Sequence, residues 1–145
     1  MKIAIIGAGA IGRTLARRLG GAGHDVSIAN SRAPETVDAA ALSTGARAVW
    51  AADVTADADV VIVSVNLNQV PVVAPLVQGA PTGAVVIDTS NYYPQRDGSL
   101  DGFEDGQVES LWVQSLYGRP VTKAWNSVLS ASFAEKGAAP IIAAR

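Results

Sequence analysis

The chain has 145 residues, of which 49% are hydrophobic and 17% are charged, and it contains no cysteine. This composition indicates one folded domain with a sizeable core and excludes a disordered tail, a disulfide framework and a thiolate nucleophile. Because 11 basic residues balance 13 acidic ones and no apolar run approaches a membrane span, we expect a cytoplasmic protein with neither a nucleic-acid nor a membrane partner.

The start of the chain predicts a strand, a helix and a second strand. A continuous apolar run over residues 3–6 is typical of a strand buried on both faces of a parallel sheet. From residue 11, apolar side chains recur at helical spacing until the glycines at 20–23. Residues 25–30 then predict the second strand, so the first two strands should be parallel and joined by a right-handed crossover.

The same alternation continues to the end of the chain. We expect further helices over residues 34–42, 51–58, 70–77, 109–117 and 127–136, and further strands over 47–50, 60–65, 84–88 and 121–125. Residues 95–107 contain three Asp-Gly pairs and predict a solvated surface loop without the ligand spacing of a calcium loop. The pattern indicates an α/β fold with a doubly wound, mostly parallel sheet of the Rossmann type, as a single domain over residues 1–145.

The segment after the first strand has the glycine spacing of a dinucleotide-binding turn. It reads G-x-G-x-x-G and opens the first helix, where backbone N–H groups and the helix dipole favour phosphate. An ordinary strand-to-helix turn is the alternative. The residues that we expect to bind the cofactor here are Gly7, Ala8, Gly9, Ala10, Ile11 and Gly12.

The end of the second strand carries the residues that should select the cofactor. An enzyme that uses NAD usually has a carboxylate at this position, about 20 residues beyond the glycines, which binds the ribose hydroxyls. This chain has Asn30, Ser31 and Arg32 instead, and a hydroxyl and a guanidinium suit a 2′-phosphate. The sequence therefore favours NADP over NAD. At the end of the strand over 60–65, we expect Val65 and Asn66 to be further cofactor-binding residues. The alternative is that Asn30 and Ser31 cap the next helix and that Arg32 is solvated.

Five segments together resemble the NADPH-dependent coenzyme F-420 reductase family. They are residues 1–7, the glycine turn over residues 7–12, residues 23–32 with Gly-His-Asp-Val leading into Asn-Ser-Arg, residues 88–94 (Asp-Thr-Ser-Asn-Tyr-Tyr-Pro) and residues 121–126 (Val-Thr-Lys-Ala-Trp-Asn). The nucleotide-binding half is also similar to that of pyrroline-5-carboxylate reductase. The resemblance implies hydride transfer between NADPH and the deazaflavin ring of F-420, with Ser31 and Arg32 matching the pair that holds the 2′-phosphate. Family members usually continue for several tens of residues beyond such a segment, so the chain is expected to lack part of the C-terminal portion.

The acceptor side of the site is less sharply marked. Asn91, Tyr92, Lys123 and Asn126 follow or end late strands, where they could face the nicotinamide or the acceptor. Equally, Asn126 could cap the last helix, Lys123 could be solvated and Tyr92 could pack within its loop. Hydride transfer requires no nucleophilic side chain, so no residue is singled out as catalytic.

The expected partner is a small-molecule hydride acceptor. Two other functions stay open: an NADPH-binding regulatory or dimerising module without catalysis, and a reductase of a small carbonyl or imine. A homodimer could lend residues across its interface, but no feature of the sequence requires one.

Overall fold

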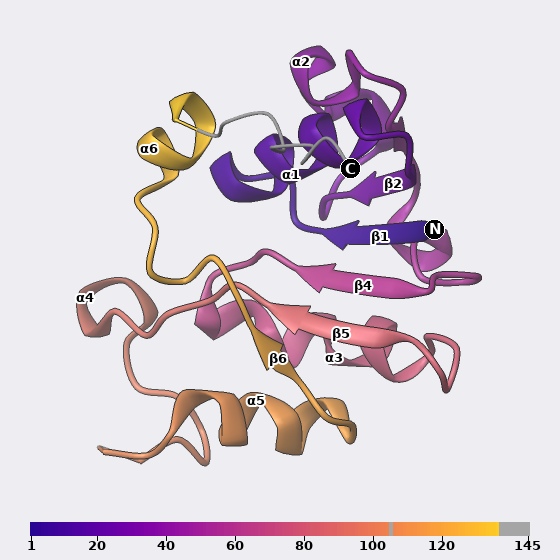
Figure 1. Ribbon diagram of the computed structural model, residues 1–145. Helices are drawn as coiled ribbons and strands as arrows, with labels where there is room; N and C mark the ends of the chain where they lie inside the picture. Colours follow the sequence, from indigo (N-terminus) through magenta and orange to yellow (C-terminus); the bar gives the residue numbers. More distant parts are fainter. Residues whose placement is uncertain (105, 137–145) are drawn as a thin grey trace, which may run out of the picture.

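The computed structural model describes residues 1–104 and 106–136, which form a parallel sheet with helices on both faces (Figure 1). The strands are β1 (Lys2–Ile6), β2 (Asp25–Ala29), β3 (Arg47–Ala48), β4 (Val60–Val63), β5 (Val85–Asp88) and β6 (Thr122–Lys123). Their order is β3-β2-β1-β4-β5-β6, and each pair of neighbours is parallel. The expected doubly wound α/β sheet is therefore confirmed, with its switch point between β1 and β4.

Two hydrophobic cores lie on the two faces of this sheet. The helices are α1 (Ala10–Gly21), α2 (Ala39–Leu42), α3 (Val70–Gln78), α4 (Pro94–Asp97), α5 (Glu109–Tyr117) and α6 (Ser130–Glu135). Successive side chains of β1 enter opposite cores, as the apolar run predicts: Ile3 and Ile5 pack with α1 and α2, and Ala4 and Ile6 pack on the side of α3 and α5. Within the described residues, no helix has both the length and the apolarity to span a membrane.

The segment expected to form a helix over residues 34–42 is instead interrupted. A 3-10 turn, η1 (Pro34–Thr36), is followed by extended backbone at Val37 and Asp38, and only then by α2. The Val37 side chain is buried in the core. The Asp38 carboxylate accepts a hydrogen bond from the Ala40 N–H at 2.8 Å. An N-cap residue has a non-helical backbone, so capping α2 with Asp38 ends any helix before that position.

The last helix also begins later than predicted, at Ser130 with Leu129 as its N-cap, so Asn126 does not cap it. Trp125 has a left-handed backbone conformation with φ of 59°, which breaks any helix at that point.

Three other short elements are smaller than expected. β3 and β6 have two residues each, and the helix predicted over residues 51–58 is a 3-10 turn, η2 (Ala51–Asp53). A further turn, η3 (Leu67–Gln69), precedes α3.

The predicted surface loop over residues 95–107 is partly structured. Its first residues complete α4, and Asp97 is buried rather than solvated. The Asp97 carboxylate accepts a hydrogen bond from the Tyr93 N–H at 2.8 Å and is paired with Arg96. These bonds compensate for the burial of the charge.

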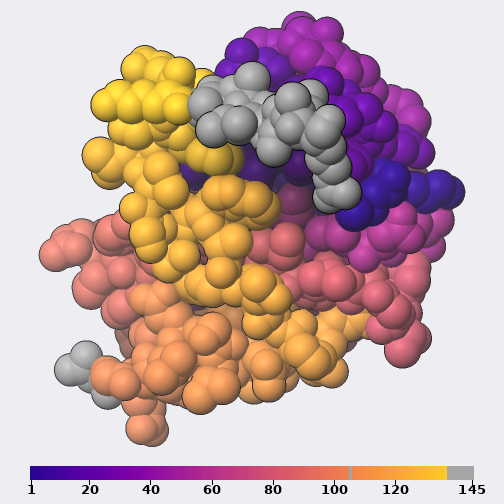
Figure 2. All heavy atoms as spheres, in the orientation of Figure 1, coloured from indigo at the N-terminus to yellow at the C-terminus, as the bar shows by residue number. Residues whose placement is uncertain are grey.

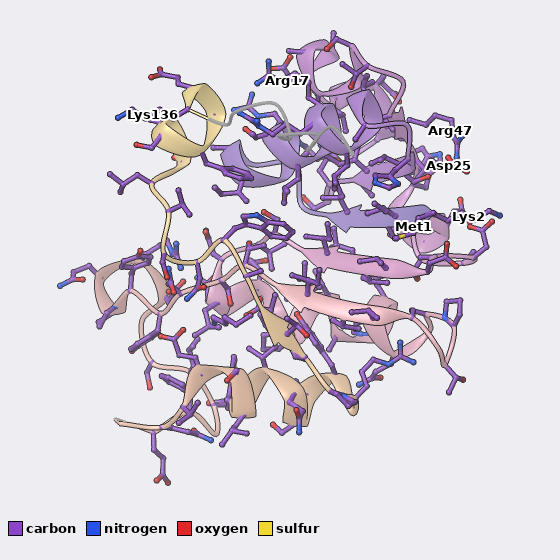
Figure 3. The ribbon with its side chains drawn as sticks, viewed as in Figure 1. Met1, Lys2, Arg17, Asp25, Arg47 and Lys136 are labelled. Atoms are coloured by element: carbon purple, nitrogen blue, oxygen red, sulfur yellow. The ribbon has the colours of Figure 1, made fainter. Side chains whose placement is uncertain are left out.

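The charged residues Lys2, Asp25 and Arg47 lie at the amino-terminal ends of the first three strands. Figure 3 shows Lys2, Asp25 and Arg47 near the amino-terminal ends of β1, β2 and β3. Arg47 pairs with Asp25 at 2.8 Å, and Lys2 pairs with Asp57. The carboxyl ends of the strands are therefore the edge where a ligand is expected, and α4 and α6 lie on that side (Figure 1).

Candidate functional site

The glycine turn between β1 and α1 fits tightly at two of its three glycines. A Cβ atom on Gly12 would lie 2.0 Å from the Gly7 carbonyl oxygen. Gly7 has a φ of +106°, and a Cβ there would lie 2.1 Å from the Ser64 carbonyl oxygen at the end of β4. At Gly9, by contrast, a Cβ would meet no heavy atom within 4 Å. The turn is therefore packed against the sheet at Gly7 and Gly12 and leaves open space at Gly9.

The first turn of α1 faces that open space without a side-chain cap. Gly9 is the N-cap residue, no side chain caps the helix, and the first turn contains no acidic residue. The N–H groups at a helix N-terminus have no partner within the helix and carry the positive end of its dipole. Ala10 and Ile11 from this turn line the adjoining hollow, so the arrangement suits a phosphate group.

A cleft of about 820 Å³ extends from the glycine turn across the end of β2. Its two walls differ in chemistry. One wall carries polar side chains: Arg13, Asn30, Ser31, Arg32, Thr36 and Asp38. The other carries apolar side chains from η2 and α3: Ala51, Val72, Val73, Pro75 and Leu76. Such a cleft can take a molecule with one flat apolar part and one anionic part. We call this half of the site the adenosine side, and the half described below the nicotinamide side, after the parts of NADP that the sequence leads us to expect there.

The polar wall of the adenosine side presents one cation that its surroundings leave free. Arg32 is exposed, and its guanidinium has neither an ion pair nor a hydrogen bond with any described residue. Asn30 instead shapes the turn: its Oδ1 accepts the Arg32 N–H and its Nδ2 donates to Thr36 Oγ1, both at 2.9 Å. η1 has Ala33 as its N-cap and no side-chain cap, so Asn30 and Ser31 do not cap it.

Asp38, the carboxylate of this wall, is neutralised locally. Arg13 on α1 donates to Asp38 Oδ2 at 2.8 Å. The N–H of Ala40, and after it Arg13, hold the pKa of Asp38 below its usual value. The polar wall therefore has a net positive charge, contributed by Arg32, which favours an anionic ligand.

A second hollow, of about 340 Å³, continues the cleft on the side of β5 and β6. The two hollows share Gly9, Ser64, Val65 and Asn66, so they form one continuous path along the carboxyl edge of the sheet. The remaining lining residues are Ala10, Ile11, Thr89, Ser90, Asn91, Tyr93, Arg96, Trp125, Asn126, Val128, Leu129 and Ser130. We call this half the nicotinamide side.

Behind the nicotinamide side lies a network of buried charges. The Asp88 side chain is fully buried, and its Oδ2 accepts hydrogen bonds from Lys123 Nζ at 3.1 Å and from Ser90 Oγ at 2.9 Å. Lys123 Nζ also donates to Glu109 Oε2 at 3.2 Å. Burial, and to a lesser extent the nearby Asp88 carboxylate, raises the pKa of Tyr117, which stays neutral in the core. The network fixes Ser90, which lines the hollow.

The four expected acceptor-side residues separate into two pairs. Asn91 and Asn126 line the hollow, and Asn91 Nδ2 donates to the Asn126 carbonyl oxygen at 2.6 Å. Lys123 and Tyr92 do not line this hollow. Lys123 is held by two carboxylates. Tyr92 packs on Phe103 at 4.9 Å between ring centroids and donates its hydroxyl to the Gly98 carbonyl oxygen at 2.7 Å.

The structure also brings residues to the hollow beyond these four. Tyr93 and Arg96 lie at its rim, with the Arg96 guanidinium carbon 4.8 Å from the Tyr93 ring centroid. Arg96 also donates to the Asn91 carbonyl oxygen at 2.7 Å. Burial raises the pKa of Asp97, but Arg96 and the Tyr93 N–H outweigh it, so the pKa lies below its usual value.

Some of the lining residues that were not predicted obey a general rule for parallel sheets. Ser64, Thr89 and Ser90 follow β4 and β5 directly, where ligands bind in such sheets. Arg96 had no such signal, because its place depends on the fold of its loop.

The family comparison agrees with this geometry. Residues 2–92 match the family described as NADP oxidoreductase, coenzyme F420-dependent. No curated protein matches the chain significantly.

Among solved structures, SMa0349 of Sinorhizobium meliloti, described as a hypothetical protein, is 34% identical with a TM-score of 0.72, over 92% of this chain and 65% of its own. A protein of Arthrobacter sp. FB24, provisionally described as an F420-dependent NADP reductase, is 21% identical with a TM-score of 0.69, over 91% and 65%.

The 3-hydroxyisobutyrate dehydrogenase of Mycobacterium tuberculosis shares the fold at 22% identity and a TM-score of 0.63, over 84% of this chain and 38% of its own. The chain thus spans less than two thirds of the length of these three proteins. It has the fold of NADP-dependent oxidoreductases, and the match over residues 2–92 shows that it belongs to the coenzyme F420-dependent NADP oxidoreductase family.

Proposed function

We propose that the chain binds NADP(H) along the continuous cleft and takes part in hydride transfer between the nicotinamide and a small deazaflavin or flavin-like acceptor. The observation that carries the proposal is the path from Arg32, which pairs with no described residue, past the open space at Gly9, to the hollow beside Asn91 and Asn126. Family membership supports the same cofactor.

Each part of the cleft would hold a different part of the cofactor. The apolar wall of the adenosine side suits the adenine ring, and Ser31 and Arg32 suit the 2′-phosphate. The pyrophosphate would lie at Gly9 and the first turn of α1. The bound nicotinamide supplies or accepts the hydride, so the tasks of the protein are to orient the two rings and to exclude water.

Preference for NADP over NAD follows from the charges at the end of β2. A carboxylate that binds ribose hydroxyls would repel a 2′-phosphate, and residues 30–32 contain none. The neighbouring Asp38 is paired with Arg13.

The test is a titration of the wild type and Arg32→Ala with NADPH and with NADH. A charge-assisted contact to phosphate contributes about 1.5–3 kcal/mol, so NADPH should bind Arg32→Ala roughly 10- to 100-fold more weakly, with NADH nearly unchanged. Arg47→Ala is the matched control, because Arg47 lies at the opposite edge of the sheet. Equal weakening of both nucleotides would refute the assignment to the 2′-phosphate.

Turnover is tested separately. Oxidation of NADPH is followed with F-420, free flavins and small imines as acceptors. Activity with F-420 or a flavin supports the proposal. Activity only with imines would indicate a small-substrate reductase, and tight binding without activity would indicate a non-catalytic module.

A further inference from the structure

Residues 124–135 cross the open edge of the sheet from the end of β6 to α1. In Figure 1 this yellow-orange segment leaves β6, runs outside the carboxyl ends of the strands and ends as α6 beside α1. Figure 2 shows it as a continuous band between the orange lower part and the indigo upper part of the molecule. We call residues 124–135 the strap. It contributes five residues to the nicotinamide side: Trp125, Asn126, Val128, Leu129 and Ser130.

The strap is fixed at its first end by the sheet. The Ala124 N–H donates to the Asp88 carbonyl oxygen at 3.1 Å, and the Asn126 carbonyl oxygen accepts from Asn91. Beyond these bonds, Leu129 is 77% exposed, so the middle of the strap is held only weakly by packing.

The far end of the strap is fixed by one arginine of α1. Arg18 Nη2 donates to the carbonyl oxygens of Phe133 and Ala134, each at 3.1 Å. The same guanidinium lies 5.8 Å from the Phe133 ring centroid, and the Phe133 ring lies 6.3 Å from that of Trp125. A cation at the C-terminal end of a helix also interacts favourably with its dipole.

α6 depends on these contacts. It has six residues and none of them is fully buried. An isolated helix of this length is unstable in water, so tertiary contacts must hold it in place. Among the described residues, Arg18 provides the polar part of those contacts.

We propose that Arg18 is a positioning residue that holds the strap across the cleft, so that the strap completes the wall of the nicotinamide side. The inference rests on the proposed function for the identity of the ligand. Arg18 lines neither half of the cleft, and the lining of the adenosine side includes no residue of the strap. Releasing the strap should therefore open the nicotinamide side and leave the adenosine side intact.

The first test requires no nucleotide. Backbone hydrogen exchange is measured in the wild type, Arg18→Ala and Arg47→Ala. Arg47 is the control arginine, because it is exposed and lies at the amino-terminal ends of the strands, away from the strap (Figure 3). Exchange at residues 133–136, where the N–H groups of Phe133 and Lys136 donate to the carbonyl oxygens of Leu129 and Ser132, should rise by roughly tenfold or more in Arg18→Ala, with β1 and β4 still protected and Arg47→Ala unchanged. Unchanged exchange of the strap in Arg18→Ala would overturn the role of Arg18.

The second test compares NADPH with 2′,5′-ADP, which carries only the adenosine half. Arg18→Ala should bind NADPH roughly 3- to 10-fold more weakly, equivalent to about 0.7–1.4 kcal/mol, and bind 2′,5′-ADP like the wild type. Phe133→Ala removes the ring that lies beside Arg18 and Trp125 but keeps the carbonyl oxygens that accept from Arg18, so it should weaken NADPH binding in the same direction to a smaller extent, even if Arg18→Ala folds poorly. Equal effects on both ligands, or none on NADPH, would overturn the role of the strap as a wall.

Failure of the proposed function looks different. In that case the wild type itself would not bind 2′,5′-ADP, whereas hydrogen exchange would still report whether Arg18 holds the strap.

Discussion

The two sides of the cleft are built in different ways. The glycine turn and the polar wall of the adenosine side come from consecutive segments, β1 to η1, and the central feature of this part is a backbone turn that leaves open space at Gly9. The nicotinamide side is assembled by side chains from distant segments: Asn91 meets Asn126, Lys123 meets Asp88, and Arg18 meets Phe133. The adenosine side depends on the space left by missing side chains, and the nicotinamide side depends on hydrogen bonds that side chains donate to distant segments.

The largest effect is expected in the glycine turn of the adenosine side. Gly12→Ala would place a Cβ against the Gly7 carbonyl oxygen, and neither the turn nor the helix can move without disturbing β1. We expect the free energy of unfolding to fall by more than about 3 kcal/mol, as for severe overpacking. Denaturant unfolding followed by circular dichroism measures it. A stable Gly12→Ala protein would show that the turn is not held as tightly as described.

Gly9→Ala is the matched control within the same turn. Its Cβ would enter open space, so the stability should stay close to that of the wild type, whereas NADPH binding should weaken by roughly tenfold or more because the methyl group occupies the approach to the backbone. Loss of stability with unchanged binding would reverse the roles given to these two glycines.

The second prediction concerns the buried ion pair behind the nicotinamide side. Lys123→Met leaves the buried Asp88 carboxylate with Ser90 as its remaining side-chain partner. Removing one member of a buried pair costs about 3–5 kcal/mol, and because Lys123 is 19% exposed we expect about 2–3 kcal/mol of unfolding free energy.

Two further variants test this assignment. The double variant Asp88→Asn/Lys123→Met should recover part of the loss. Lys2→Met, at the exposed pair with Asp57, should leave the stability unchanged within error. An equally small effect at Lys123 would show that the network is not important for the fold.

This contrast also explains what the sequence could predict. The glycine spacing after an apolar strand is a local pattern, and Ser31 and Arg32 lie just beyond the next strand, so position alone predicts both. The fold class followed from continuous apolar strands alternating with helices.

The remaining features depend on tertiary contacts between distant residues. The side chain of Lys123 turns toward Asp88 and Glu109, and Asn126 meets Asn91 instead of capping a helix. No spacing rule connects residues 14 to 35 positions apart in this way.

The third prediction concerns the rim of the nicotinamide side. Asp97→Asn removes the ion pair with Arg96 and should lower the free energy of unfolding at neutral pH by about 1–2 kcal/mol. Since the pKa of Asp97 is lowered in the folded protein, its contribution is full above the unfolded pKa of about 4 and is lost as the pH falls through the folded value.

The difference between wild type and Asp97→Asn should therefore shrink in acid. Unfolding curves at several pH values measure this difference, and other acidic groups cancel because both proteins contain them. Asp101→Asn, at an exposed acid of the same segment, is the control and should show no such difference. A constant difference down to low pH would mean that Asp97 does not act as a carboxylate.

The smallest expected change in the free energy of unfolding is at Tyr117, and there it is an increase rather than a decrease. It tests whether the buried network around Asp88 includes this tyrosine. The Tyr117 hydroxyl is buried and has no hydrogen-bond partner among the described residues, so Tyr117→Phe should leave the stability unchanged or raise it by less than about 1 kcal/mol. Because burial raises the pKa of Tyr117, the wild type should lose stability as the pH rises through about 10, the value for an unfolded tyrosine, and Tyr117→Phe should lose less. Unfolding at neutral and alkaline pH checks both points. If Tyr117→Phe were destabilised by more than about 1 kcal/mol, the Tyr117 hydroxyl would be hydrogen-bonded. The buried network around Asp88 would then extend to Tyr117 in the core.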